Sequence, residues 1–414
     1  MRSLISITLV AVLLTLSACK AKPKPEYSRP LPPGASALRK LDPADWPDLR
    51  YALPMDESFM AARNRSLGWF AKNSSKNFFP LDGFSHDQSR ASVYALPMIA
   101  WDTKDSGGTP AFIARMHEEF DIYTSVGWDG SGTVLFTGYY SPIFQASATP
   151  TAEYRFPLYK RPADLVADPL TGEVKGRRTA TGFSPYPARR ELESSNQLAG
   201  SELVYLKSRL DAYIVEVQGS AKLTMTDGTT MLVGFSGTNG LAYTSLGRML
   251  ADEGKIDKDK ISLPLIREYF LTHPAELDGY IHRNDRFVFF ATYDATDWPA
   301  GSLGVKVEPR RSIATDKLIY PRGVVTMVVT KTAQTPLSNH DQVKPFHQLM
   351  LDQDTGGAIR APGRADLYFG IGSDAEGFAG RQVHEGRLYY FFLKPERVSH
   401  WLSRMQGAAG VVPQ

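Results

Sequence analysis

Residues 352–372, DQDTGGAIRAPGRADLYFGIG, are the most informative segment of this 414-residue chain. Two aspartates, Asp354 and Asp366, are separated by a loop rich in Gly and Pro, and the Gly-Gly pair after Asp354 permits a sharp turn or close contact with a ligand. Asp366 lies within an apolar run whose side chains would desolvate its carboxyl and raise its pKa. A carboxyl with a raised pKa can act as a general acid near neutral pH.

Both aspartates also fit purely structural roles. Asp354 precedes Thr-Gly-Gly and would cap a turn equally well. The alternation of side chains along a strand could point Asp366 outward, away from any site. The pattern alone therefore leaves a catalytic and a structural role open for each residue.

Strand-like segments predominate on both sides of this stretch. Residues 223–235 alternate around Asp227-Gly228, a dipeptide typical of hairpin turns. Further strands are predicted at 134–140, 212–217, 287–291, 324–330 and 388–393. Helical patterns are fewer: a segment that begins with Thr109 as N-cap and Pro110, and segments 241–254 and 262–272. Many short strands with few helices predict a mainly β protein built from barrels.

The composition excludes several classes of function. Hydrophobic residues make up 43% and charged residues 22% of the chain, as in a globular protein with a substantial core. The net charge is only +3, without a basic cluster interleaved with aromatics, so we expect no nucleic-acid partner. HExxH, GxSxG, P-loop and GxGxxG motifs are absent, and the eight histidines lack metal-ligand spacing. We therefore expect neither a metal nor a cofactor, which leaves carboxylates as the reactive groups.

The N-terminal residues resemble a bacterial lipoprotein signal. Residues 4–16 form an apolar run, shorter than the roughly 20 residues of a membrane-spanning helix. The run leads into Leu-Ser-Ala-Cys at 16–19, which resembles a lipobox, and Cys19 is the single cysteine of the chain. We expect residues 1–18 to be a signal peptide and Cys19 to carry the lipid. An ordinary signal peptide with an incidental cysteine is the alternative. Lys20, where aspartate would signal inner-membrane retention, favours the periplasmic face of the outer membrane.

Several segments in a fixed order carry a resemblance to a known family. They are FTGYYSP at 136–142, VEVQGS at 215–220, RSIATD at 311–316, QDTGGAI at 353–359 and DLYFG at 366–370. Together they resemble the membrane-bound lytic murein transglycosylase A (MltA) family, whose C-terminal 3D domain is a small double-psi β-barrel. The chain departs from the family pattern at Ala221, at Ala361 and in the segment 283–290. These departures bear on substrate preference more than on reaction type.

The resemblance implies a fold of two barrels. A double-psi β-barrel is assembled from sequence on both sides of an inserted second β-barrel, and the glycan binds in the groove between them. We therefore expect the first barrel domain at 49–140 and 261–400, with the 3D domain at about 300–395, and the inserted domain at 141–260. The Pro-rich residues 19–48 are expected to form a stiff tether without a core, and residues 401–414 a tail.

The resemblance also implies an activity. The family cleaves the β-1,4 bond between N-acetylmuramic acid and N-acetylglucosamine in peptidoglycan without water, and leaves a 1,6-anhydro-N-acetylmuramic acid end. One aspartate, here Asp366, would act as acid and then as base, with Asp354 as the second candidate. Candidate substrate-binding residues are Thr137, Gly138, Tyr139, Tyr140, Gln218, Gly219, Ser220, Arg311, Asp316, Gly356 and Gly357. We expect a monomer that acts on glycan strands, and recruitment into a wall-synthesis or division complex would fit the family.

Structural roles and other functions remain open at this level. The tyrosines suit a half-buried strand, Gln218 a turn, Arg311 an ion pair, and Asp316 a loop that it holds in place. The protein could also be a non-catalytic, expansin-like lipoprotein that binds peptidoglycan. A β-glucan hydrolase would instead use Asp354 and Asp366 as a pair, about 5–5.5 Å apart for retention or about 6.5–9.5 Å apart for inversion.

Overall fold

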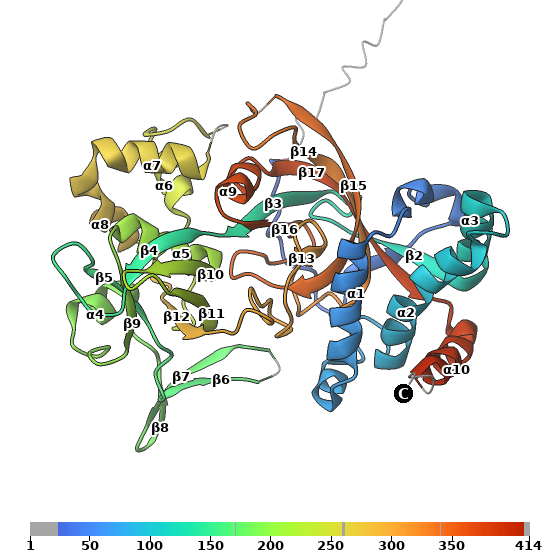
Figure 1. Cartoon of the computed structure of the whole chain (residues 1–414), viewed down its shortest axis with the longest axis horizontal. Coiled ribbons are helices and arrows are strands. Elements are labelled where there is room, and N and C mark those ends of the chain that lie inside the picture. Colours follow the sequence, from blue (N-terminus) through green and yellow to red (C-terminus); the bar gives the residue numbers. More distant parts are fainter. Residues whose placement is uncertain (1–23, 170, 259–260, 340, 410–414) are drawn as a thin grey trace, which may run out of the picture.

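Two β-barrels lie side by side in this chain, and helices surround each of them (Figure 1). The computed structural model describes residues 24–169, 171–258, 261–339 and 341–409. The chain builds three strands of the first barrel's sheet, leaves it to form the second barrel, and then returns to complete the first.

The first barrel combines strands from both halves of the chain. Its sheet runs β1-β2-β17-β14-β15-β13-β16-β3, and an additional pairing of β17 with β3 closes the last six strands into a ring. The strands are β1 (Leu38–Lys40), β2 (Phe120–Ser125), β3 (Val134–Ser141), β13 (Ser312–Ala314), β14 (Val325–Ala333), β15 (Val343–Asp354), β16 (Arg364–Ile371) and β17 (Val383–Leu393). Since β3 precedes the second barrel and the other five strands of the ring follow it, the predicted assembly from both sides of an insertion is confirmed.

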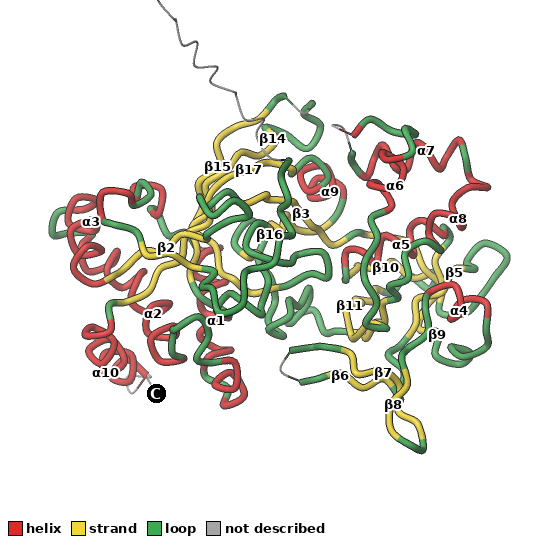
Figure 2. The backbone as a smooth tube through the Cα atoms, turned by 180° about the vertical axis from the view of Figure 1, so that it is seen from behind, coloured by secondary structure: helices red, strands yellow, loops and turns green. Residues whose placement is uncertain are grey.

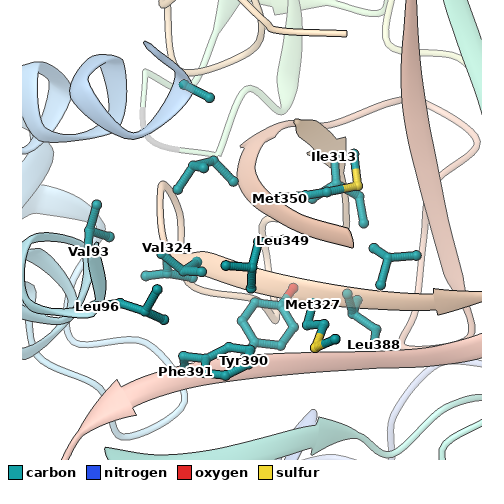
Figure 3. Packing of buried hydrophobic residues seen from close by; sticks show 14 of the residues in the cluster. Val93, Leu96, Ile313, Val324, Met327, Leu349, Met350, Leu388, Tyr390 and Phe391 are labelled. Atoms are coloured by element: carbon teal, nitrogen blue, oxygen red, sulfur yellow. The ribbon is translucent and has the colours of Figure 1, made fainter. Parts of the chain in front are cut away.

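Helices cover the end of the first barrel that faces away from the second (Figures 1 and 2). They are α1 (Glu57–Phe70), α2 (His86–Thr103), α3 (Gly108–Glu119) and α10 (Val398–Ala409), while the short α9 (Ser373–Ala379) packs on β3 and β16. Val93 and Leu96 of α2 point toward Val324, Tyr390 and Phe391 of the barrel (Figure 3). This apolar layer fixes the barrel strands from outside.

Of these helices only α3 was predicted from the sequence, whereas α1, α2, α9 and α10 were not. Helix α2 is buried along much of its length and contains Pro97, so it shows neither a one-sided apolar pattern nor an unbroken helical composition. Helix α3 was predicted, but it begins at Gly108 with Gly107 as N-cap, at a φ of 134°, and not at Thr109. The sequence therefore predicted this helix correctly but placed its N-cap at Thr109 instead of Gly107.

Both predicted terminal segments need correction where the structure describes them. Residues 24–48 are no free tether, because β1 pairs with β2 and the side chains of Ala37 and Leu38 are buried in the core. Residues 401–414 were expected to form a tail, yet the described residues 401–409 continue α10, and Trp401 is completely buried and donates its indole N–H to Glu119. Burial of apolar side chains in both segments offsets the conformational entropy that is lost when they become ordered.

The predicted signal peptide and lipid-bearing Cys19 lie outside the described residues. Within the described ranges, no helix has both the length and the apolar character that crossing a bilayer requires.

The second barrel is the inserted domain. Its sheet runs β12-β11-β10-β4-β9-β5, and a bridge between Lys160 and Phe290 joins the two ends. The strands are β4 (Ile143–Ser147), β5 (Phe156–Tyr159), β9 (Glu202–Leu206), β10 (Ser220–Met225), β11 (Thr230–Thr238) and β12 (Val288–Thr292). Because β12 completes this barrel, the insertion extends beyond the predicted boundary at 260. The hairpin around Asp227-Gly228 is confirmed as β10 and β11.

Further elements of the insertion surround this barrel. A small separate sheet contains β6 (Leu165–Ala167), β7 (Val174–Thr179) and β8 (Gly182–Ser184). The helices are α4 (Arg189–Ser194), α5 (Arg209–Gln218), α6 (Leu246–Asp252), α7 (Leu263–Thr272) and α8 (Leu277–Ile281). Helix α7 matches the prediction for 262–272, whereas α6 forms only the later part of 241–254, since Ser245 is its N-cap.

The predicted strand at 212–217 is wrong, because these residues belong to α5. Ser208 caps the helix by accepting the backbone N–H of Asp211, and Gly219 ends it in a left-handed conformation with a φ of 77°. These flanking residues favour a helix more strongly than the β-branched residues inside it favour a strand.

Candidate functional site

Three adjacent strands place Asp354, Ala314 and Asp366 in one row across the first barrel. Ala314 of β13 is the register partner of Asp354 on β15 and of Asp366 on β16. The bulge after Ile313 creates this alignment, because unbroken pairing would place Gln353 beside Ala314. Neighbouring strands lie about 4.8 Å apart, so the backbones of the two aspartates are separated by roughly 10 Å. Ala314, whose side chain is small, lies between them.

Asp366 accepts one hydrogen bond from its strand neighbour. Thr137 of β3 is its register partner and donates its hydroxyl to Asp366 Oδ1 at 2.7 Å. An N–H of Arg364 donates to the same hydroxyl at 3.1 Å, which orients the threonine proton toward the carboxylate. Burial raises the pKa of Asp366 to about 6, while the Thr137 hydrogen bond and the charge of Arg364 oppose the rise. This carboxyl can therefore hold a proton near neutral pH.

Asp354 has a different environment, because three donors hold its carboxylate. Tyr139 donates its hydroxyl to Oδ2 at 2.8 Å, and the backbone N–H groups of Ser302 and Thr355 each donate to Oδ1 at 2.8 Å. Burial raises the pKa of Asp354, whereas these three donors favour its charged form. The arrangement fixes the position of Asp354 and leaves Asp366 with more freedom to exchange a proton.

A buried polar cluster behind the site was not predicted. Asp352, which is completely buried, accepts the hydroxyl groups of Thr315 and Tyr390 at 2.8 Å and contacts the ammonium of Lys317. Thr315 in turn donates its backbone N–H to the carbonyl of Asp354 at 3.1 Å. The cluster therefore supports the strand end that carries Asp354. Its sequence signal is a second acidic residue on β15, Asp352, two positions before Asp354.

Comparison with known proteins matches this architecture. The family model for the MltA specific insert domain matches residues 135–291, and that for the 3D domain matches residues 311–392. The membrane-bound lytic murein transglycosylase A of Escherichia coli K12 is 32% identical over 280 residues, which cover 66% of this chain and 70% of the relative. The Vibrio cholerae protein of that name is 32% identical over 294 residues, with 69% and 72% covered.

This chain belongs to the MltA family. A crystal structure of the membrane-bound lytic murein transglycosylase from Agrobacterium tumefaciens is similar, with a TM-score of 0.67, 25% identity and coverage of 88% of this chain and 99% of that one. The crystal structure of Escherichia coli MltA with bound chitohexaose shares the fold, with a TM-score of 0.64, 24% identity and coverage of 90% and 98%. The sequence resemblance to the MltA family is thereby confirmed.

The MltA-like segment 136–142 divides between the site and the interior. Thr137 and Tyr139 contact the two aspartates, as described above. Gly138 serves packing, because a Cβ there would lie 2.8 Å from Ala379 Cα of α9 and from the ring of Phe369. Tyr140 was expected to bind substrate, but only 2% of it is exposed, so it belongs to the core.

The segment 215–220 joins the two barrels. Gln218 accepts the backbone N–H of Tyr140 at 3.1 Å, and Gly219 ends α5. Ser220 shares a hydrogen bond with Ser141 at 2.8 Å, where β3 leaves the first barrel. These contacts give the three predicted binding residues a structural place at the junction.

The structure places Arg311, a predicted substrate-binding residue, in an ion pair on the helix side of the first barrel. Its guanidinium pairs with Asp56 at 2.5 Å and donates to the carbonyl of Leu349 at 3.0 Å, and the residue is 7% exposed. These contacts fit the alternative of a structural ion pair.

The remaining predicted residues shape the loop between β15 and β16. Asp316 accepts the backbone N–H groups of Leu318 and Ala361, at 3.1 and 2.9 Å, and so holds this loop from β13. Gly356 allows Ile359 to pack closely, and a Cβ at Gly357 would lie 2.8 Å from the guanidinium carbon of Arg286. Both glycines therefore permit close packing beside the site.

Proposed function

We propose that this chain is a peptidoglycan lytic transglycosylase in which Asp366 acts as the acid and then as the base. The observation that carries the proposal is the contrast between the two neighbouring aspartates. Burial raises the pKa of Asp366 to about 6, and its carboxyl accepts only one side-chain hydroxyl. Asp354, in contrast, is held by three hydrogen-bond donors. Membership of the MltA family supports the reaction class. We place the glycan between the two barrels, because β3 carries Thr137 and Tyr139 and runs directly toward the insertion.

Each proton in the proposed reaction has a source and a destination. Protonated Asp366 donates to the glycosidic oxygen, the bond from this oxygen to C1 of N-acetylmuramic acid breaks, and C1 acquires oxocarbenium character. The Asp366 carboxylate then accepts the proton of the C6 hydroxyl as that oxygen bonds to C1, which gives the 1,6-anhydro ring and restores the acid. The nucleophile belongs to the same sugar, so its effective concentration is high and no water is needed. Asp354, as an anion, stabilises the positive charge that develops at C1.

The proposal can be tested on purified murein sacculi. The parent protein, Asp366→Asn and the control Asp374→Asn, which changes an exposed aspartate of α9, are each incubated with sacculi, and the products are analysed by liquid chromatography and mass spectrometry. Muropeptides lighter by one water than hydrolysis products are expected from the parent and the control. Loss of a general acid lowers rates about 10²–10⁴-fold, so Asp366→Asn should release almost none.

Other outcomes would favour other functions. Anhydro products from Asp366→Asn at the parent rate would move the acid to another residue, with Asp354 tested next. Hydrated reducing ends would favour a hydrolase with two carboxylates, and sacculus binding without release would favour a non-catalytic, expansin-like protein.

We further propose that Cys19 anchors the protein to the outer membrane by a lipid, on the periplasmic face. The lipobox-like residues 16–19 support this, as do relatives named membrane-bound. Mass spectrometry should find a diacylglycerol-modified N-terminal cysteine in the mature protein, and Cys19→Ser should move the protein from the membrane to the soluble periplasmic fraction. An unmodified, soluble parent protein would refute the anchor.

A further inference from the structure

We propose that three arginines around the loop that leads to Asp366, namely Arg286, Arg360 and Arg364, bind a carboxylate on the side arm of the muramyl residue at the cleaved bond. The enzyme would therefore select anionic glycan over neutral glycan. The inference rests on the proposed function, and it names the substrate class for that same site.

Two of the arginines belong to the loop between β15 and β16. Arg364 begins β16, two residues before Asp366, and donates to the Thr137 hydroxyl at 3.1 Å. Within the described residues its Nε is buried and has no hydrogen-bond partner. Arg360 lies four residues earlier and is 3.6 Å from Asp316, with 52% of its side chain exposed. Arg364 therefore has a donor to spare near Asp366, and Arg360 exposes half of its side chain on the loop that precedes it.

The third arginine reaches this loop from the inserted domain. Arg286 packs its guanidinium on Gly357, where a Cβ would be 2.8 Å from its Cζ, and donates to the carbonyl of Leu241 at 3.4 Å. Tyr243, which follows Leu241, is within electrostatic reach of both Arg286 and Arg364. One phenol is therefore influenced by guanidinium groups from both domains.

The two carboxylates near Arg286 and Arg360 each have further partners, although Asp316 also lies 3.6 Å from Arg360. Glu216, which is near Arg286, accepts two N–H groups of the buried Arg189 at 3.0 and 2.6 Å. Asp316 already accepts two backbone N–H groups. Burial and the charge of Arg360 both lower the pKa of Arg286, as expected for a cation without a matched counter-ion. Three cations gathered around carboxylates that already have other partners repel one another, and a bound anion would relieve that cost.

The substrate supplies an anion at the required place. Muramic acid carries a lactyl arm on C3, which ends in a free carboxylate or, as an amide, in a peptide that bears carboxylates. N-acetylglucosamine oligomers have the same β-1,4 backbone and no carboxylate. Guanidinium groups bind carboxylates through paired N–H donors, so a carboxylate on this arm fits the cluster better than any neutral group of the sugar.

The test measures affinities for three probes, with turnover blocked by Asp366→Asn in the full chain. The probes are peptide-bearing glycan strands, amidase-treated strands with free lactyl carboxylates, and the neutral hexamer of N-acetylglucosamine. Arg286→Gln and Arg360→Gln are each compared with Arg178→Gln, a change in the separate sheet of β6, β7 and β8. Loss of one charge-assisted hydrogen bond should lower the anionic-to-neutral affinity ratio about tenfold, and the control should keep the parent ratio. The ratio of the parent should also fall with added salt.

The probes identify the source of the carboxylate. If the arginine variants lose affinity only for amidase-treated strands, the carboxylate is that of the lactyl group. If they lose affinity only for peptide-bearing strands, the carboxylate belongs to the peptide. An equal ratio for parent, Arg286→Gln and Arg360→Gln overturns the inference, even when the enzyme with intact Asp366 releases anhydro products. Conversely, a lowered ratio together with an intact enzyme that releases no such products would retain the anion site and reject the proposed reaction.

Discussion

A single hydroxyl is expected to set the pH range of activity. Thr137 donates to the charged form of Asp366 and so lowers the pKa that burial raises to about 6. Since Asp366 must be protonated before it can donate, activity should fall as the pH rises through its pKa. Thr137→Val removes the donor and raises the pKa, so the alkaline limb of the profile of kcat/KM against pH should move to higher pH.

The control for this shift is Thr229→Val, which removes an exposed hydroxyl bonded to Asp227 in the hairpin of the inserted domain. It should leave the pH profile unchanged. If Thr137→Val lowers activity equally at every pH, without moving the limb, then Asp366 is not the group that titrates in this reaction.

The buried pair of Lys317 and Asp352 is expected to matter more as a unit than as two residues. Lys317→Met leaves the Asp352 carboxylate buried without its cation, which should lower the free energy of unfolding by about 3–5 kcal/mol. Adding Asp352→Asn removes the stranded charge and should restore much of that stability. Urea denaturation of both single variants and the double variant measures their coupling.

A surface pair gives the comparison. Lys207→Met removes the partner of Glu153 in an exposed ion pair and should leave the urea midpoint nearly unchanged. If the stability lost in the double variant equals the sum of the losses in Lys317→Met and Asp352→Asn, the two buried groups do not act as a unit.

Helix α5 shows which elements the sequence could not predict. Ala212 and Val215 pack into the core of the second barrel, while Leu210, Tyr213 and Ile214 pack into a separate cluster with α6, α7 and α8. A helix buried on two sides loses the one-sided apolar spacing that identifies helices in a sequence. The hairpin of β10 and β11 was predictable because its turn and its alternation are both local.

Close packing of α9 on β3 should be essential to the site. Gly138 lies between Thr137 and Tyr139, and a Cβ there would be 2.8 Å from the backbone of Ala379. Gly138→Ala must displace α9 or bend β3, so we expect a loss of about 1–3 kcal/mol in stability and a large loss of activity. Thermal unfolding and the release of anhydro muropeptides measure the two effects. Gly68→Ala in α1, whose Cβ would meet open space, should not lower either.

At the scale of the molecule, the sequence predicted two barrels and misplaced their edges. The motifs identified the strands β3, β15 and β16 that carry the candidate site. The end of the insertion depends on β12 pairing with β11 and on a bridge from Phe290 to Lys160, which no local pattern records. The arginine cluster was missed for the same reason, since Arg286 and Arg364 are far apart in the sequence and meet only after both barrels have formed.

The relative placement of the barrels should affect catalysis more than stability. Arg267 of α7 pairs with Glu376 of α9 at 3.4 Å and with Asp211 of α5 at 2.6 Å, so it links the insertion to the first barrel. The side chains of Arg267 and Glu376 are 31% and 22% exposed, and such a pair contributes at most about 1 kcal/mol to stability. Under the proposed function, however, the glycan contacts both barrels at once, so a looser junction weakens its binding.

Glu376→Gln is therefore expected to raise KM for peptidoglycan several-fold while the midpoint of thermal unfolding changes little. The matched control is Arg248→Gln, which breaks an exposed pair with Asp252 within α6 and does not bridge the domains. Both variants should unfold like the parent, and only Glu376→Gln should require more substrate, because a substrate held by two domains is sensitive to their alignment. If Glu376→Gln keeps the parent KM, this ion pair does not align the barrels for the substrate. The contacts of Gln218 and Ser220 with β3 would then be sufficient to hold the junction.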